Sequence, residues 1–359
     1  MSYSNLENIG LSQAVFAEAS CYEGLFVGRV VSQYKDLYKV VTEKGELTAK
    51  VSGKFRYTVK TFLDYPAVGD FVMVDRLQDD EGIGIIHHIL TRKSAVTRKA
   101  AGTAVEGQLI AANIDTVFIC MSLNQDFNVR RVERYLGIVW ESRAVPVIVL
   151  TKADVCEDLA DKLAEVGVAA CGVEVIVTSS LQGTGYEAVK EYLGRGRTVA
   201  LMGSSGVGKS TLINCLLGQE ALETQTIRND DKGRHTTTRR ELLVLPGGGA
   251  VIDTPGMREL GIDSADLSKT FADIDELAKK CKFRDCTHTR EPNCAVQKAI
   301  EDNLLSKERF SSYVKLKKEM AYESLSPTQR EAEKLAAMFK EVGGIKNARK
   351  LVKEKYKRR

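Results

Sequence analysis

The chain of 359 residues is 43% hydrophobic and 28% charged, which is enough apolar material for two or three packed domains and excludes a disordered protein. No stretch approaches the roughly 18 uninterrupted apolar residues of a membrane-spanning helix, and the first residues lack the basic and apolar regions of a signal peptide. We therefore expect a soluble, cytoplasmic protein that has no membrane partner.

Positive charge is concentrated at the C-terminal end. The net charge is only +4, yet residues 346–359 contain eight Lys or Arg residues and one acid, so the remaining chain is net negative. This segment predicts either a basic helix that docks on RNA or a disordered, solvated end. Of the eight cysteines, five are scattered and three lie close together, which favours metal binding in a reducing compartment over disulfide bonds.

Short strand-like runs dominate residues 25–95, which follow a polar extension (residues 1–24) with one helical pattern at about residues 11–16. The runs are LFVGRVVSQY, LYKVVT, ELTAKVSG, FRYTVK, DFVMVD and GIGIIHHIL. About five short strands in this length predict a closed barrel of the oligonucleotide-binding (OB) type. Such barrels bind nucleic acid, and the alternative is a module used only for packing. His87 and His88 lack acidic or cysteine neighbours at ligand spacing, so we expect them to be structural.

The spacing of apolar residues changes after a connecting segment that is rich in basic residues. Residues 96–112 are the expected linker, and the basic residues at or in it are either solvated or contact phosphate, namely Arg92, Lys93, Arg98 and Lys99. In residues 113–265 apolar strands alternate with amphipathic helices, which predicts a parallel, doubly wound α/β sheet with ligands at the carboxyl ends of its strands. The expected strands cover residues 114–123, 145–150, 173–180, 198–202 and 250–253, and the expected helices cover residues 129–142, 157–167 and 185–193.

A phosphate-binding loop follows the strand at residues 198–202. The segment GSSGVGKST has the G-x-x-x-x-G-K-S spacing, in which glycines let backbone N–H groups face phosphate oxygens and the lysine adds a positive charge. The serine is a ligand for Mg²⁺, and the helix that follows presents its positive end. The alternative is a Gly/Ser turn that matches by chance. The predicted nucleotide-binding residues are Gly203, Ser204, Ser205, Gly206, Val207, Gly208, Lys209, Ser210 and Thr211.

A base-reading motif precedes this loop in the chain. The segment T-K-A-D is a variant of N-K-x-D, whose aspartate accepts two hydrogen bonds from guanine, whereas adenine offers no such pair of donors. The alternatives are a helix N-cap for the aspartate and a plain serine-rich turn for the supporting loop after the next strand. The predicted base-binding residues are Thr151, Lys152, Ala153, Asp154, Ser179 and Ser180.

Two more motifs follow the phosphate loop. GRHTTT offers the hydroxyl groups of Thr236 and Thr237 to Mg²⁺ and the γ-phosphate, and D-T-P-G places Asp253 at a strand end with Gly256 three residues later. We expect Ser210 and Asp253 to lie on the Mg²⁺ side of a bound GTP or GDP. All five guanine-nucleotide motifs are therefore present in permuted order, because the base-reading loops come before the phosphate loop.

The clustered cysteines have the spacing C-x4-C-x-H-x5-C. Three thiolates and one imidazole predict a closed tetrahedral site for one structural Zn²⁺. The chain has only four histidines, so a histidine inside this cluster argues against buried free cysteines. The predicted ligands are Cys281, Cys286, His288 and Cys294. The basic residues around them are either phosphate contacts or a solvated rim, namely Lys279, Lys280, Lys282, Arg284 and Arg290.

The permuted order, GRHTTT, DTPG and the cysteine cluster together resemble the circularly permuted GTPases of small ribosomal subunit biogenesis, the RsgA/YjeQ family. The resemblance covers nearly the whole chain. It implies a multidomain α/β protein with an N-terminal OB-type barrel, a circularly permuted P-loop GTPase domain at residues 113–265, and a zinc-binding module with a basic helical tail at residues 266–359. It also implies a small ribosomal subunit and rRNA partner and subunit-stimulated hydrolysis of GTP coupled to release. We expect a monomer.

At two positions that bear on nucleotide binding and hydrolysis, the sequence departs from the residues usual in GTPases. Thr151 replaces the usual asparagine, which removes an amide that braces the phosphate loop. Met257 follows D-T-P-G where many GTPases carry a glutamine, and an apolar side chain does not polarise water. We therefore expect His235 to position the attacking water or accept its proton, unless it only orders its loop or contacts the ribosome. The competing function is a zinc-stabilised RNA-binding protein that uses guanine nucleotide as a conformational ligand with little turnover.

Overall fold

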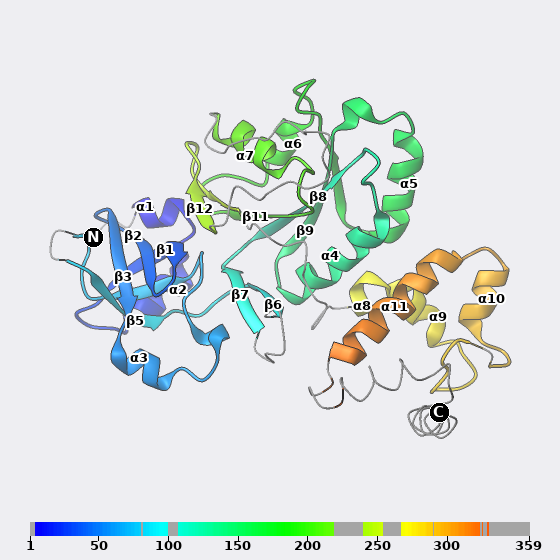
Figure 1. The fold of residues 1–359 in the computed structure, drawn as a ribbon, viewed down its shortest axis with the longest axis horizontal. Coiled ribbons are helices and arrows are strands. Elements are labelled where there is room, and N and C mark those ends of the chain that lie inside the picture. The colour runs from blue at the N-terminus through cyan, green and yellow to red at the C-terminus, as the bar shows by residue number, and fades with distance from the viewer. Residues whose placement is uncertain are drawn as a thin grey trace, which may run out of the picture.

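The computed structural model describes residues 4–79, 82–99, 107–218, 240–253, 267–289 and 291–323, together with residues 325 and 329. A small β-barrel, a central α/β domain and a C-terminal helical module follow one another across the molecule (Figure 1). No helix in the described ranges has both the length and the apolar character needed to cross a membrane.

The N-terminal barrel has five strands that close into a ring, as the sequence predicts. Each strand pairs with two others in the order β1-β2-β3-β5-β4-β1, and only the β3–β5 pair is parallel. Alternate side chains point inward, so Val40, Leu47 and Ile86 are fully buried in the barrel core. The strands are β1 (Phe26–Tyr34), β2 (Leu37–Thr42), β3 (Glu46–Val51), β4 (Phe71–Val74) and β5 (Gly84–Ile89).

The strand-like run FRYTVK does not form a strand, so this part of the prediction is wrong. Its first four residues belong to helix α3 (Gly53–Thr58), which is followed by a short 3-10 helix, η1 (Phe62–Asp64). Ser52 caps α3, because its Oγ accepts a hydrogen bond from the Phe55 N–H at 3.0 Å. Phe55 packs against the barrel core while Tyr57 is exposed. The cap and this single buried contact outweigh the strand preference of the aromatic and β-branched residues.

Two short helices cover the barrel before β1. They are α1 (Ser4–Asn8) and α2 (Gln13–Ala19), and the second agrees with the helical pattern expected near residues 11–16. Leu6 and Leu11 are buried together with Phe71 of β4. The N-terminal extension is therefore packed onto the barrel.

The central domain contributes six strands to the sheet, and five of them are parallel, as predicted. Their order is β10-β9-β8-β11-β13-β12, and only β12 runs antiparallel to its neighbour. Side chains of β8 alternate between two cores, so Ile119 packs with α4 and α5 on one face and Phe118 with α6 and α7 on the other (Figure 1). The strands are β8 (Thr116–Ser122), β9 (Val145–Thr151), β10 (Glu174–Val177), β11 (Thr198–Met202), β12 (Glu241–Val244) and β13 (Ala250–Asp253). The helices are α4 (Val129–Glu141), α5 (Leu159–Ala169), α6 (Tyr186–Lys190) and α7 (Lys209–Leu217).

The expected linker contains regular structure, so its prediction as a solvated connection is wrong. Strands β6 (Ala95–Lys99) and β7 (Gly107–Ala112) form an antiparallel pair there. Val96 is buried in the core shared with α4. Arg92, just before β6, forms an ion pair with Asp70, with 2.7 Å between Nη2 and Oδ2. The sequence alone did not predict the strand pair β6–β7, because both strands are short and Val96 is buried by a helix that comes later in the chain.

A buried arginine joins the barrel to the central domain. Arg29 of β1 is fully buried, and its guanidinium donates hydrogen bonds to Gly69 O at 3.1 Å, Asn113 O at 3.2 Å and Thr198 Oγ1 at 2.9 Å. Burial lowers the pKa of Arg29 to about 10, so it stays charged at neutral pH. Strand β1 also pairs with β12, so one sheet continues from the central domain into the barrel.

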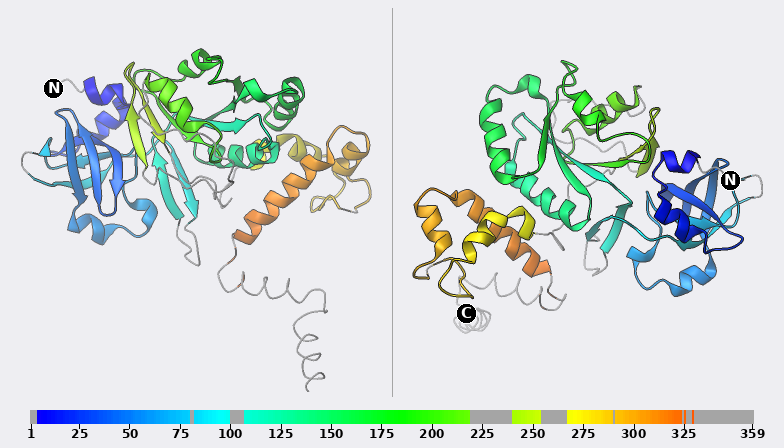
Figure 2. Two further views of the ribbon diagram at one scale, coloured as in Figure 1. Left: turned by 45° about the horizontal axis from the view of Figure 1, so that its top comes forward. Right: turned by 180° about the vertical axis from the view of Figure 1, so that it is seen from behind.

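The C-terminal module is a group of helices beside α4 (Figure 2). Phe271, Val296 and Leu316 lie in its core. Its helices are α8 (Leu267–Thr270), α9 (Ala272–Ala278), α10 (Ala295–Glu301) and α11 (Lys307–Glu323). Almost all of the basic tail, including residues 346–359, lies outside the described residues.

Candidate nucleotide and metal sites

The phosphate loop, residues 203–211, connects the end of β11 to α7. Gly203 has φ of +155°, and a Cβ there would lie 2.5 Å from Cys120 O, so only glycine fits. Gly206 and Gly208 also have positive φ. The Lys209 Nζ donates to Gly203 O at 2.8 Å and Ser204 O at 2.6 Å. The ammonium group therefore lies against the loop, where phosphate binding requires a cation.

Asp253 lies at the same edge of the sheet. It is the last residue of β13 and pairs with Leu201 of β11 in parallel register, so its carboxylate ends its strand beside the loop. Ser210 occupies the first turn of α7. A carboxylate and a hydroxyl are oxygen ligands of the kind Mg²⁺ prefers, so these two residues fit the cation that accompanies a nucleotide.

The base-reading loops follow β9 and β10. Asp154 lies in the 3-10 helix η3 (Ala153–Val155), and its Oδ1 accepts a hydrogen bond from Ser179 Oγ at 2.5 Å. Ser179 is fully buried, and the Ala153 N–H donates to Thr178 O at 3.2 Å. The two loops are thus tied together, and Ser179 fixes the orientation of the carboxylate. Such a fixed carboxylate is able to accept the two N–H groups of a guanine.

Thr151 braces the phosphate loop despite replacing an asparagine. Its Oγ1 donates a hydrogen bond to Val207 O at 2.5 Å, and the residue is buried at the end of β9. The expected loss of a brace is therefore wrong, because the shorter hydroxyl reaches the loop backbone directly. This contact also joins the base-reading loop to the phosphate loop.

We expect Thr151→Val to weaken GDP binding about fivefold, because it removes one hydrogen bond worth about 1 kcal/mol and leaves Val207 O unpaired beside the phosphates. Thr151→Ser keeps the hydroxyl and serves as the control, with affinity near that of the wild type. A titration with a fluorescent GDP analogue measures both. Equal affinity of the valine variant and the wild type would show that this hydrogen bond does not brace the loop.

Arg131 of α4 also contacts the phosphate loop, and sequence reasoning missed it. Its Nη1 donates to Ser204 Oγ at 2.6 Å and lies 2.9 Å from Asp126 Oδ2. The available signal was topological, because α4 follows β8 and β8 lies next to β11, so the first turns of α4 reach the loop.

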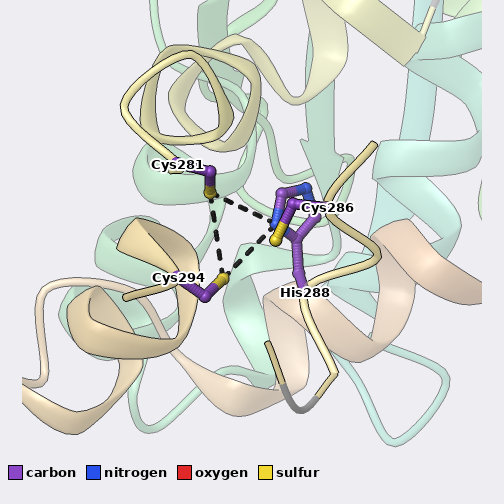
Figure 3. A group of neighbouring side chains, drawn as sticks. All are labelled: Cys281, Cys286, His288 and Cys294. Atoms are coloured by element: carbon purple, nitrogen blue, oxygen red, sulfur yellow. Dashed lines mark hydrogen bonds between the residues drawn. The ribbon is translucent and has the colours of Figure 1, made fainter. Parts of the chain in front are cut away.

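The four predicted zinc ligands converge in the C-terminal module (Figure 3). The Sγ atoms of Cys281 and Cys294 lie 3.9 Å apart, and the Nδ1 of His288 lies 3.6 Å from the first and 3.4 Å from the second. Tetrahedral bonds of zinc to sulfur and nitrogen place ligand atoms about 3.8 Å (S to S) and about 3.6 Å (S to N) apart. With Cys286, whose Sγ belongs to the same cluster, the residues fit one structural Zn²⁺.

The local backbone positions these ligands. Cys294 is the N-cap of α10, and its Sγ accepts a hydrogen bond from the Gln297 N–H at 3.4 Å. His288 has φ of +58° and its carbonyl oxygen accepts a hydrogen bond from the Gln297 side chain. A helix N-terminus and a fixed loop therefore support the thiolate and the imidazole that a closed zinc site needs.

Several predicted site residues lie outside the described residues. They are His235, Thr236, Thr237 and Gly256, together with Arg290 of the basic rim. The other predicted nucleotide and zinc ligands are described, and they form two separate groups, one at the carboxyl ends of β9, β10, β11 and β13 and one in the C-terminal module.

Comparison with known proteins gives matches over the whole chain. The family model described as RsgA GTPase matches residues 89–263. A model described as ABC transporter matches residues 186–342, a span that includes the phosphate loop used by both classes.

Individual proteins match over greater lengths. The small ribosomal subunit biogenesis GTPase RsgA 2 of Lactiplantibacillus plantarum is 51% identical over 355 residues, which is 99% of each chain. The small ribosomal subunit biogenesis GTPase RsgA of Methanosarcina acetivorans is 44% identical over 90% of this chain and 87% of that protein. Among solved structures, YjeQ from Thermotoga maritima has a TM-score of 0.61 at 30% identity, covering 83% of this chain and 99% of that one. YloQ, described as a circularly permuted GTPase, has a TM-score of 0.58 at 25% identity, covering 83% and 96%.

Proposed function

We propose, on the premise that this chain belongs to the RsgA family and hydrolyses GTP, that it binds the small ribosomal subunit and its rRNA as a monomer in the cytoplasm. The subunit stimulates hydrolysis, and hydrolysis times the release of the protein from the maturing subunit. The relatives that match nearly all of the chain carry the name small ribosomal subunit biogenesis GTPase, which supports this partner.

The observation that carries the nucleotide part of this proposal is the joining of the base-reading and phosphate loops. The hydrogen bond between Thr151 and Val207 places them side by side although the chain visits them in permuted order. Asp154, oriented by Ser179, reads guanine, and Lys209 holds the β- and γ-phosphates.

The cation and the remaining phosphate contacts complete the site. Ser210 and Asp253 hold Mg²⁺, which neutralises part of the phosphate charge when it is bound. Thr236 and Thr237 add hydroxyl groups on the γ-phosphate side, and the N–H of Gly256 contacts the γ-phosphate.

Helix α4 supports the coupling of the nucleotide site to the zinc module. Arg131 near its start contacts the phosphate loop. Glu133, two residues later, is fully buried and forms an ion pair with Arg309 of α11, with 3.0 Å between Oε1 and Nη1. Arg309 also pairs with Asp273 of α9 at 2.7 Å. A change in the loop therefore reaches the module through one helix, which is the kind of two-sided contact that coupled release requires.

We expect His235→Ala to lower subunit-stimulated GTP hydrolysis by about 10²-fold or more, because it removes the group that positions or deprotonates the attacking water. Nucleotide affinity should stay nearly unchanged, whereas Lys209→Ala is the control that loses nucleotide binding. Phosphate release by the purified protein, with and without small subunits, measures both activities.

Two outcomes of this experiment are separable. Stimulated turnover of the His235→Ala variant at the wild-type rate would contradict the proposed role of His235 in hydrolysis. Wild-type turnover that small subunits leave unchanged would contradict the proposed function itself.

A further inference from the structure

The first turns of helix α4 carry three arginines, and each has a different partner. Arg130 forms an ion pair with a glutamate on its own helix, and Arg134 forms one with a glutamate of α11. Arg131 instead points at the phosphate loop, where its Nη1 donates a hydrogen bond to Ser204 Oγ at 2.6 Å. The side chain of Arg131 is 28% exposed, so most of it is covered by protein. One of the three guanidinium groups is therefore built into the wall of the nucleotide site.

Asp126 fixes the orientation of this guanidinium group. Its two carboxylate oxygens accept hydrogen bonds from Arg131, with 2.9 Å to Nη1 and 3.3 Å to Nη2. The loop that carries Asp126 is itself held, because the Asp126 N–H donates to Asn124 Oδ1 at 3.1 Å. A carboxylate that binds both terminal nitrogens of a guanidinium sets its plane and offsets its charge. Arg131 is thus a directed donor to Ser204 whose charge is already balanced.

Ser204 connects Arg131 to the lysine of the phosphate loop. This serine is the second residue of the loop and is buried. Its side chain accepts the hydrogen bond from Arg131, and its carbonyl oxygen accepts one from Lys209 Nζ at 2.6 Å. The ammonium group that meets the β- and γ-phosphates therefore rests on a residue whose side chain is held by α4. A shift of Ser204 would move the support of that ammonium group.

The chemistry of phosphoryl transfer links this support to the rate of hydrolysis. The protein contributes mainly by positioning the reactants and by placing charge before the transition state forms. Met257 stands where many GTPases carry a glutamine, so the placement of the remaining polar groups matters more. GDP binding depends on the cradle around the β-phosphate, which the positive φ angles of Gly206 and Gly208 form by themselves. Loss of the support should therefore lower turnover more than GDP affinity.

We propose that Arg131 is a positioning residue for GTP hydrolysis, which acts through Ser204 to hold the Lys209 ammonium where it meets the γ-phosphate. The role deepens the GTPase part of the proposed function, on which it rests, and it requires neither the ribosomal partner nor His235. The competing role is a direct contact between Arg131 and a phosphate. Asp126 argues against that contact, because the phosphate would have to displace a carboxylate that binds two nitrogens of the guanidinium.

The test follows phosphate release by the full-length chain over a range of GTP concentrations, with Mg²⁺ and without small subunits. Arg131→Ala should lower kcat about tenfold, the effect of one lost charge-assisted hydrogen bond. KM and the affinity for a fluorescent GDP analogue should stay within about threefold of the wild type. Arg131→Lys keeps a cation but loses the fork that binds both Asp126 oxygens, so its kcat should recover to within about threefold of the wild type.

A double-variant cycle tests whether the effect passes through Ser204. Ser204→Ala should lower kcat by about the same factor as Arg131→Ala, and the double variant should be no slower than either, because both changes break one contact. Arg134→Ala is the matched control. It removes an arginine of the same helix whose ion pair is about one third exposed, and it should keep the wild-type kcat. The fluorescence of Trp140 during urea unfolding verifies that each variant is folded.

Three results would overturn the proposal. The first is a wild-type kcat in Arg131→Ala. The second is a wild-type kcat in Ser204→Ala beside a slow Arg131→Ala, which would indicate a direct contact between the arginine and the phosphates. The third is a loss of GDP affinity as large as the loss of kcat, which would assign Arg131 to nucleotide binding in general. Addition of small subunits to the wild type is a separate measurement, so absent stimulation would contradict the proposed partner and leave the comparison of variants intact.

Discussion

Arg309→Met is expected to lower the free energy of unfolding by about 3 kcal/mol, because it leaves the buried carboxylate of Glu133 without the buried one of its two charged partners. Glu133 is fully buried, and its other contacts are Arg130 Nη1 at 2.6 Å from Oε1 and Ser312 Oγ at 2.6 Å from Oε2. Burial opposes the charge of Arg309, yet Asp273 and Glu133 hold its pKa above its ordinary value. The methionine keeps most of the side-chain volume, so the loss is electrostatic rather than a cavity.

A second ion pair between the same two helices provides the matched control. Arg134 of α4 lies 2.6 Å from Glu319 of α11, but both side chains are about one third exposed. Arg134→Met should therefore cost less than about 1 kcal/mol. Trp140, the single tryptophan, lies in α4 with the Lys269 ammonium 5.3 Å from its ring centroid, so its fluorescence reports on this interface during urea unfolding.

The double variant Glu133→Gln/Arg309→Met separates the pair from its surroundings. It should cost less than the sum of the two single variants, because each single variant leaves one member of the buried pair charged without the other. Hydrogen exchange in residues 267–323 should rise in Arg309→Met and stay unchanged in Arg134→Met. Equal stability of these two variants, or additive costs in the cycle, would show that the buried pair does not hold the module against α4.

The sequence predicted those parts of the fold in which the spacing of apolar residues matches the burial of the strand over several residues. The parallel strands β8, β9 and β11 are continuous apolar runs, since both faces of each are covered, and the barrel strands β2 and β3 alternate because one face of each is exposed to solvent. It failed for α3, where one capping serine decides the local structure, and for β6 and β7, whose cover comes from distant helices. Short elements depend on tertiary contacts that no local pattern records.

The candidate sites divide in the same way. The phosphate loop and the zinc cluster were predictable because their chemistry requires fixed residue types at short spacing. Arg131, Glu133 and Arg309 were not, because a charged residue in an amphipathic helix ordinarily faces water. The partner that buries Glu133 lies 176 residues away in the chain. Only the three-dimensional arrangement shows that one helix contacts both the phosphate loop and the zinc module.

Cys294→Ser is expected to abolish zinc binding and to unfold the C-terminal module locally. A structural zinc site of this kind contributes an apparent binding free energy of about 10–16 kcal/mol, which is also folding free energy for the segment it closes. The side chain of Cys294 is buried and faces two other ligands, so the substitution removes a zinc ligand, while serine keeps an N-cap acceptor for α10. The purified variant should contain no stoichiometric zinc by elemental analysis.

The loss of structure in Cys294→Ser should be confined to the C-terminal module. Residues 281–301 should become sensitive to limited proteolysis, and the variant should lose binding to small subunits. GDP binding should be retained, because none of the four ligands lies on an element that forms the phosphate loop. Cys171→Ser, at an exposed cysteine outside the cluster, is the control and should match the wild type. A Cys294→Ser variant that keeps stoichiometric zinc would show that Cys294 is not a required ligand. A zinc-free variant that resists protease would show that the module owes its fold to the apolar contacts around Phe271 and Leu316 and not to a metal ion.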